Sequence, residues 1–123
     1  MTSKKLFTRH SSLITYMSAS RIETFQQMLE TDSENTMVRF GLANELLKAD
    51  RYEEAVGALN DYLTRADDEG AAYGMLARAL EKLKRHDEAR GAYERGIEAA
   101  EKHGHPSMAE DYSMTLEADY EDD

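Results

Sequence analysis

Two successive stretches of the chain match one another at a fixed spacing of 34 residues. Residues 36–69 read TMVRFGLANELLKADRYEEAVGALNDYLTRADDE, and residues 70–103 read GAAYGMLARALEKLKRHDEARGAYERGIEAAEKH. They share ten identities, whereas unrelated segments of this length share about two on ordinary residue frequencies. The match therefore indicates a tandem duplication of one structural unit. The identical pairs are Leu42/Leu76, Ala43/Ala77, Leu46/Leu80, Lys48/Lys82, Arg51/Arg85, Glu54/Glu88, Ala55/Ala89, Gly57/Gly91, Ala58/Ala92 and Ala66/Ala100.

Each copy has the apolar spacing of two amphipathic helices. Apolar residues recur at three- and four-residue steps over 38–47 and 52–63 in the first copy, and over 72–83 and 89–97 in the second. Small residues at matching positions predict places where two helices approach closely, because a larger side chain there would force the backbones apart. These residues are Ala43, Ala55, Ala58, Ala77, Ala89 and Ala92.

The duplicated unit resembles the tetratricopeptide repeat. The resemblance rests on the 34-residue period, on the Tyr-x-x-Leu-Ala-x-x-Leu run from Tyr73 to Leu80, and on the Ala-x-x-x-Tyr step from Ala89 to Tyr93. The first copy departs from the family pattern at Arg39, where an aromatic residue is usual, and neither copy has the usual closing proline. The resemblance implies an all-α solenoid of antiparallel helix pairs over residues 36–103.

The flanking segments extend the array to about six helices. The apolar spacing predicts a half unit at 20–35, with its helix at 20–31, so that the repeat domain spans 20–106. Residues 107–123 carry seven acids and no base, and we expect a capping helix followed by an acidic tail. Residues 1–19 are expected to form a flexible basic leader. Two other interpretations of the first 16 residues remain, a targeting segment and a wrongly assigned start ahead of Met17.

Composition argues against several classes of protein. With 25 acidic and 15 basic residues, the net charge is −10, which argues against general binding to nucleic acid phosphates. The chain has no run of about 18 apolar residues, so we expect no contact with a membrane. It has no cysteine, which excludes disulfides and cysteine-based metal sites and fits the reducing cytoplasm, where we expect the protein to act.

No set of residues in the sequence satisfies the requirements of a catalytic or metal site. His103 and His105 flank a glycine, but no third or fourth ligand follows at an ordered spacing, so we interpret them as helix-end residues. The paired acids at 53–54 and 87–88 open predicted helices, where acidic side chains complement the helix dipole. We therefore expect neither an enzyme nor a cofactor.

The resemblance to the family also implies a binding site. In tetratricopeptide arrays the first helix of each unit lines a concave groove that binds a peptide or helix of another protein. Carried over position by position, the groove residues are Met37, Phe40, Asn44, Leu47 and Lys48 from the first unit and Ala71, Gly74, Met75, Arg78, Glu81 and Lys82 from the second. The alternative interpretation is that Phe40 belongs partly to the core and that the charged residues form a solvated face.

We accordingly expect a non-catalytic adaptor, scaffold or assembly factor that binds a protein or peptide. The alternatives are a holdase-type chaperone and a regulatory subunit of a larger enzyme. The family's carboxylate clamp does not fit, since only Asn44 occupies a matching place and Met75 stands where a second Asn would be. The chain itself is expected to be a monomer or a weak homodimer, because so short an array can cover an exposed end by pairing.

Overall fold

The computed structural model describes the backbone of residues 2–120 and the side chains of residues 13 and 16–120. Within this part of the chain every regular element is a helix. The helices are α1 (Thr2–Thr31), α2 (Thr36–Lys48), α3 (Tyr52–Arg65), α4 (Ala71–Lys82), α5 (His86–Lys102) and α6 (Pro106–Asp119). Met1 and the last three acids of the predicted tail, Glu121, Asp122 and Asp123, lie outside the described residues.

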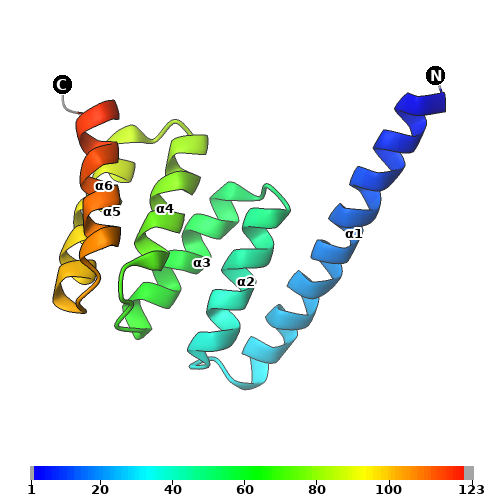
Figure 1. Cartoon of the computed structure of the whole chain (residues 1–123). Helices are drawn as coiled ribbons and strands as arrows, with labels where there is room; N and C mark the ends of the chain where they lie inside the picture. The colour runs from blue at the N-terminus through cyan, green and yellow to red at the C-terminus, as the bar shows by residue number, and fades with distance from the viewer. Residues whose placement is uncertain (1, 121–123) are drawn as a thin grey trace.

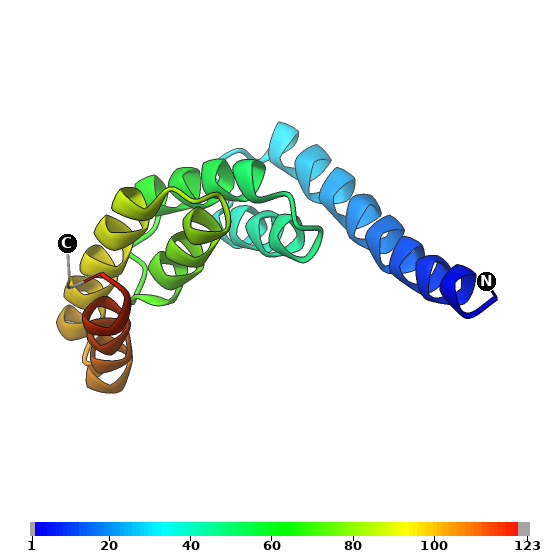
Figure 2. The ribbon, with the colours of Figure 1, turned by 90° about the horizontal axis from the view of Figure 1, so that it is seen from above.

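The six helices form an arc in which each packs against the next along the chain. Figure 1 shows α2 antiparallel to α3, and α4 antiparallel to α5, as expected for the two repeat units. Figure 2 shows α3 and α5 on the convex side of the arc and α2 and α4 on the concave side. The predicted all-α solenoid is confirmed.

The turns inside the two units have the same geometry, which accounts for two of the sequence identities. Asp50 and Lys84, at equivalent positions, both adopt positive φ values, 58° and 63°. The next residue in each turn is an arginine whose guanidinium forms an ion pair with a glutamate three residues later, at 2.7 Å for Arg51–Glu54. Arg85 pairs with Glu88 in the same way, at 2.6 Å. The conserved pair within the duplication thus fixes the start of each second helix.

The predicted close contacts between helices lie in the core. Five of the six small residues, Ala43, Ala55, Ala77, Ala89 and Ala92, are fully buried, and Ala58 is half-buried. They pack with larger apolar side chains that are themselves almost completely buried, such as Leu59 and Leu76. A methyl group at these places lets two helix backbones approach while the larger neighbours fill the remaining space.

The first helix is longer than the sequence patterns predicted. The expected helix at 20–31 is the C-terminal part of α1, and in place of a flexible leader the helix extends back to Thr2. The first 40 residues contain no glycine or proline, so no residue interrupts helical geometry in this direction. Ser18 and Ile22 are buried, and Ile22 packs in a cluster with Leu46 of α2 and Ala55 of α3.

The last helix closes the other end of the array. It begins at Pro106, two residues after Gly104, whose φ of 78° suits glycine. Tyr112 of α6 is buried and donates a hydrogen bond of 3.0 Å from its hydroxyl to the carbonyl oxygen of Gly70. Tyr120, just after α6, is also buried. The predicted apolar side of this helix therefore packs onto the second unit.

Candidate functional site

The predicted groove residues divide into two groups according to their position around α2 and α4. One group forms a row along the solvent-exposed surface, which we call the concave stripe; its members are Met37, Asn44, Lys48, Ala71, Arg78 and Lys82, with the half-buried Met75 beside them. These residues recur at three- and four-residue steps, so they share one face of each helix. The face belongs to the two helices on the concave side in Figure 2.

The second group makes contacts within the fold. Phe40 and Leu47 of α2 are half-buried and pack against the main core cluster, as the alternative interpretation of Phe40 held. Their equivalents one repeat later are Gly74 and Glu81 of α4. Gly74 is buried under the ring of Tyr112, and a Cβ atom there would lie only 2.9 Å from the ring Cε1. The assignment of Gly74 to an accessible groove is thus corrected: α6 covers it.

Glu81 acts as a shared acceptor within the fold. Its two carboxylate oxygens accept hydrogen bonds from the hydroxyls of Tyr93, at 3.2 Å, and Tyr120, at 2.8 Å. Burial and the neighbouring carboxylate raise the pKa of Tyr93 to about 12 and raise that of Tyr120 as well. The carboxylate of Glu81 therefore joins α5 and the end of α6 to α4, and its charge is already engaged by hydrogen bonds.

A small hollow lies at one end of the concave stripe. Its volume is about 280 Å³ and its lining consists of Thr36, Met37, Phe40, Tyr62 and Asp68. The rings of Phe40 and Tyr62 lie 5.2 Å apart and tilted by 58°, which gives the hollow an aromatic wall. Met37 is 84% exposed at its edge. The hollow has the size and apolar surface to receive one side chain of a partner.

Three residues of this hollow were not among the predicted groove residues: Thr36, at the start of α2, Tyr62 and Asp68. Tyr62 comes from α3, the second helix of its unit, and Asp68 from the connection to α4, whereas the prediction considered first helices only. The Tyr62 hydroxyl donates a 3.1 Å hydrogen bond to Asp68, and burial together with that carboxylate raises the pKa of Tyr62 to about 12. Asp68 also accepts from the backbone N–H groups of Gly70 and Ala72, which fixes the start of α4. The polar rim of the hollow is therefore rigidly held.

The charged members of the concave stripe are basic. Lys48 forms a 3.3 Å ion pair with the buried carboxylate of Glu45, which also lies 3.6 Å from Arg21 of α1. Arg78 and Lys82 are exposed and form no ion pair with the other described residues. Among the described residues, these two cations of the stripe have no acidic partner.

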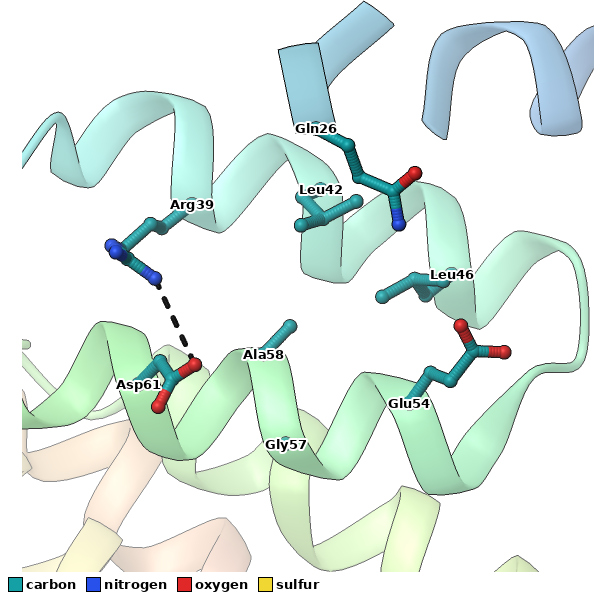
Figure 3. A pocket seen from close by; sticks show the side chains of 8 residues that line it. All are labelled: Gln26, Arg39, Leu42, Leu46, Glu54, Gly57, Ala58 and Asp61. Carbon is teal, nitrogen blue, oxygen red and sulfur yellow. Dashed lines mark ion pairs between the residues drawn. The ribbon is translucent and has the colours of Figure 1, made fainter. Parts of the chain in front are cut away.

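A second hollow lies between α1, α2 and α3 and is shown in Figure 3. Its volume is about 270 Å³, with Leu42, Leu46 and Ala58 as the apolar part of the lining. Arg39 forms a 3.7 Å ion pair with Asp61 across one end, and its guanidinium donates two hydrogen bonds to the carbonyl oxygen of Ser33. The arginine that departs from the family pattern therefore fastens the turn before α2 to α3.

The two histidines bind carboxylates and do not assemble a metal site. His103 lies 3.3 Å from Asp67 and His105 lies 2.5 Å from Glu69, so both histidines hold the turn before α6 to the connection before α4. Hydrogen bonding to the histidines lowers the pKa of each carboxylate below its ordinary value. Across residues 2–120, no three His, Asp or Glu side chains among those described are grouped so as to hold a metal ion. None of the helices in this part of the chain has the length and apolarity to cross a bilayer.

Comparison with known families agrees with the geometry. A family model described as tetratricopeptide repeat matches residues 46–109, which is just over half of the chain. A search of curated proteins found no significant match. The matched segment begins in the last turn of α2 and ends in α6, so it contains the complete second unit. Repeats of this kind generally mediate protein–protein interaction and are typically non-catalytic.

Proposed function

The chain belongs to the tetratricopeptide repeat family, and from this we propose that it is an adaptor or assembly factor that binds a segment of another protein along the concave stripe. The observation that carries the proposal is the pairing of two properties on one surface. Arg78 and Lys82 present exposed cations that form no ion pair with other described residues, and the hollow beside Met37 presents an apolar cavity with a hydrogen-bonded rim.

The chemistry of the stripe selects the kind of partner. An arginine and a lysine one turn apart favour carboxylates, and arginine can bind a carboxylate with two parallel hydrogen bonds. The hollow at the other end of the stripe accepts an apolar side chain, and the exposed thioether of Met37 adapts its shape to different groups. The partner segment is therefore acidic and carries one bulky apolar residue as an anchor.

The concave surface favours this adaptor role over a holdase role. A chaperone that shields unfolded chains needs a broad apolar surface, whereas Phe40 and Leu47 are half-buried in contacts with the fold. Met37 is the exposed large hydrophobic residue of α2 and α4. A stripe with one apolar position and several polar ones suits a defined motif.

Charge reversal on the stripe tests the proposal. The tagged chain captures proteins from an extract of its source cell, mass spectrometry identifies them, and the affinity of one purified partner is measured by calorimetry. The double variant with Arg78→Glu and Lys82→Glu is expected to weaken binding by about ten-fold or more, since about 1.4 kcal/mol corresponds to ten-fold in Kd. Both residues are exposed, so helicity measured by circular dichroism is expected to remain unchanged.

A matched control separates the stripe from general electrostatics. Lys84→Glu reverses one charge at an exposed position in the turn between α4 and α5, outside the stripe. This variant is expected to retain the affinity of the unaltered chain, and raising the salt concentration is expected to weaken only stripe-dependent binding. Equal affinity of the double variant and the unaltered chain would remove the stripe from the binding surface.

A further inference from the structure

The first helix has a face that packs on α2 and an opposite face that packs on nothing among the described residues. Ser18, Ile22, Phe25 and Leu29 follow one another at three- and four-residue steps; the first two are buried and the others half-buried. Phe25 lies against Gly41 of α2. Figures 1 and 2 show α1 at the end of the array, diverging from α2 toward its N-terminus, so its other side is open.

The open face of α1 is uncharged over about five turns, from Leu13 to Thr31. Positions on the helix side opposite Ile22 are occupied by apolar or neutral polar residues, and this set is called the open face. Its members are Leu13, Tyr16, Met17, Ser20, Thr24, Gln27, Met28 and Thr31, all of them exposed. An exposed face in a chain with 33% charged residues ordinarily carries charges.

The open face also holds most of the exposed large hydrophobic side chains. Leu13, Tyr16, Met17 and Met28 account for four of the six among the described residues, and Tyr16 is 72% exposed. Large apolar side chains gathered on one uncharged exposed face mark a surface that another molecule covers. The absence of charge and the concentration of apolar side chains therefore point to burial of this face in an assembly.

The distribution of charge along the first 35 residues indicates which molecule covers the open face. Residues 1–16 carry three bases and no acid, a net charge of +3. Residues 17–35 carry one base, Arg21, and four acids, a net charge of −3. Two copies of this segment attract one another when they run antiparallel and repel when they run parallel, since only the antiparallel arrangement sets each basic half beside an acidic half.

We propose that the open face of α1 binds the open face of a second copy in an antiparallel, two-fold symmetric dimer. A two-fold contact uses the same surface on both copies, which is the commonest arrangement in homodimers. The midpoint between the basic and acidic segments places the two-fold axis near Met17 and Ser20. The small side chain of Ser20 on the open face allows close approach of the helices there.

The other end of the array is a poorer partner for this face. The exposed side of α6 presents Glu110, Asp111 and Glu117 around Met114. A head-to-tail contact would bury these carboxylates against the uncharged open face, where no base among the described side chains compensates them. It would also propagate into open-ended oligomers, whereas the two-fold contact stops at two copies.

Sedimentation of the full chain tests the dimer. Between about 1 and 100 μM, the range in which a micromolar Kd changes the populations, the molar mass is expected to rise from one chain to two. Met17→Glu and Met17→Lys each place a charge at the centre of the contact and are expected to leave a monomer with unchanged helicity. Met114→Glu changes an equally exposed methionine on α6 and is expected to leave the dimer intact.

The opposite results overturn the proposal. A monomer at every concentration, or a dimer unaffected by both Met17 variants, would refute the open face as the contact. Loss of assembly in Met114→Glu, with species larger than dimers in the unaltered chain, would favour the head-to-tail contact instead. The Arg78→Glu and Lys82→Glu variant is expected to dimerise normally, so failure of the dimer and failure of the partner-binding proposal are separable.

Crosslinking between single cysteines tests the orientation of the helices. The chain has no native cysteine, so a substitution on the open face provides a unique thiol. A short thiol crosslinker is expected to join two copies of Ser20→Cys, which lie near the axis, and not two copies of Thr31→Cys. Efficient crosslinking through position 31 as well as through position 20 would show a parallel arrangement and overturn the proposal.

Discussion

Replacing glycine by alanine is expected to have opposite effects on stability at two helical positions. Gly57 lies inside α3, and a Cβ atom there would meet nothing within 4 Å. Gly74 lies inside α4, and a Cβ atom there would collide with the ring of Tyr112. The helix propensity gain is the same in both cases, about 1 kcal/mol for glycine to alanine. The difference between the variants therefore measures the contact with Tyr112.

The magnitudes follow from the space around each glycine. Gly57→Ala is expected to raise the free energy of unfolding by about 0.5–1 kcal/mol, because no neighbour has to move. In Gly74→Ala the aromatic ring of Tyr112 must shift, which costs about 1–3 kcal/mol of overpacking and strains its hydrogen bond to Gly70. After the propensity gain, the net loss is up to about 2 kcal/mol, so Gly74→Ala is expected to be about 1–3 kcal/mol less stable than Gly57→Ala.

Denaturant unfolding followed by circular dichroism at 222 nm measures the free energy of unfolding of both variants. The dependence of this free energy on denaturant concentration is expected to be the same in the variants and the unaltered chain. A double-mutant cycle combines Gly74→Ala with Tyr112→Leu. If the ring causes the loss of stability, the free energy of unfolding falls less in the double variant than the sum of the losses in the two single variants. Gly74→Ala that is as stable as Gly57→Ala would refute the packing of α6 on α4. Additive losses in the cycle would do the same.

Three further predictions concern packing, backbone conformation and pH. Ala55→Leu and Ala89→Leu are each expected to lower the free energy of unfolding by about 1–3 kcal/mol, and unchanged melting temperatures would contradict the helix contacts. Lys84→Gly relieves a positive φ of 63° and is expected to stabilise the turn by up to about 1 kcal/mol; a lower stability would show that no strain is present. The raised pKa of Tyr93 contributes stability that is complete below the unfolded value near 10 and is lost as the pH rises toward about 12. Tyr93→Phe is expected to reduce the alkaline loss of stability, measured by unfolding at several pH values, and an identical pH profile would exclude this tyrosine as its source.

The internal repeat made most of the fold predictable. A repeated unit has to place equivalent residues in equivalent environments, so the buried alanines and the paired arginine and glutamate of each turn followed from the alignment of the copies. The 34-residue period and the apolar face of each helix were sufficient to predict this part of the fold, because each helix packs mainly on its neighbours in the chain. These features needed no information from outside residues 36–103.

The candidate site was less predictable because it depends on residues outside the repeat. Whether position 74 faces solvent is decided by Tyr112, and whether Glu81 is free is decided by Tyr120. Both tyrosines belong to the C-terminal segment, and nothing in the two aligned copies states how that segment docks. The hollow includes Tyr62 from the second helix of its unit, whereas the family pattern places groove residues on the first helix of each unit.

The length of α1 was missed for a different reason. A terminal segment without a hydrophobic partner is usually loose, and that general expectation favoured a flexible leader. The absence of glycine and proline from the first 40 residues was the available signal for a continuous helix. Local propensity and terminal position gave opposite predictions here, and the helix follows local propensity.

The contacts of α6 have a consequence for how the chain folds. Most packing joins helices that are consecutive in the chain, and such local topology is associated with folding in microseconds to milliseconds. The hydrogen bonds of Tyr112 to Gly70 and of Tyr120 to Glu81 are exceptions, since they close loops of about 40 residues. Loop closure of that length carries an entropic cost that is recovered only after α4 and α5 have formed. The C-terminal helix is therefore expected to dock last during folding, and in native-state hydrogen exchange its amides open before those of the helices it covers.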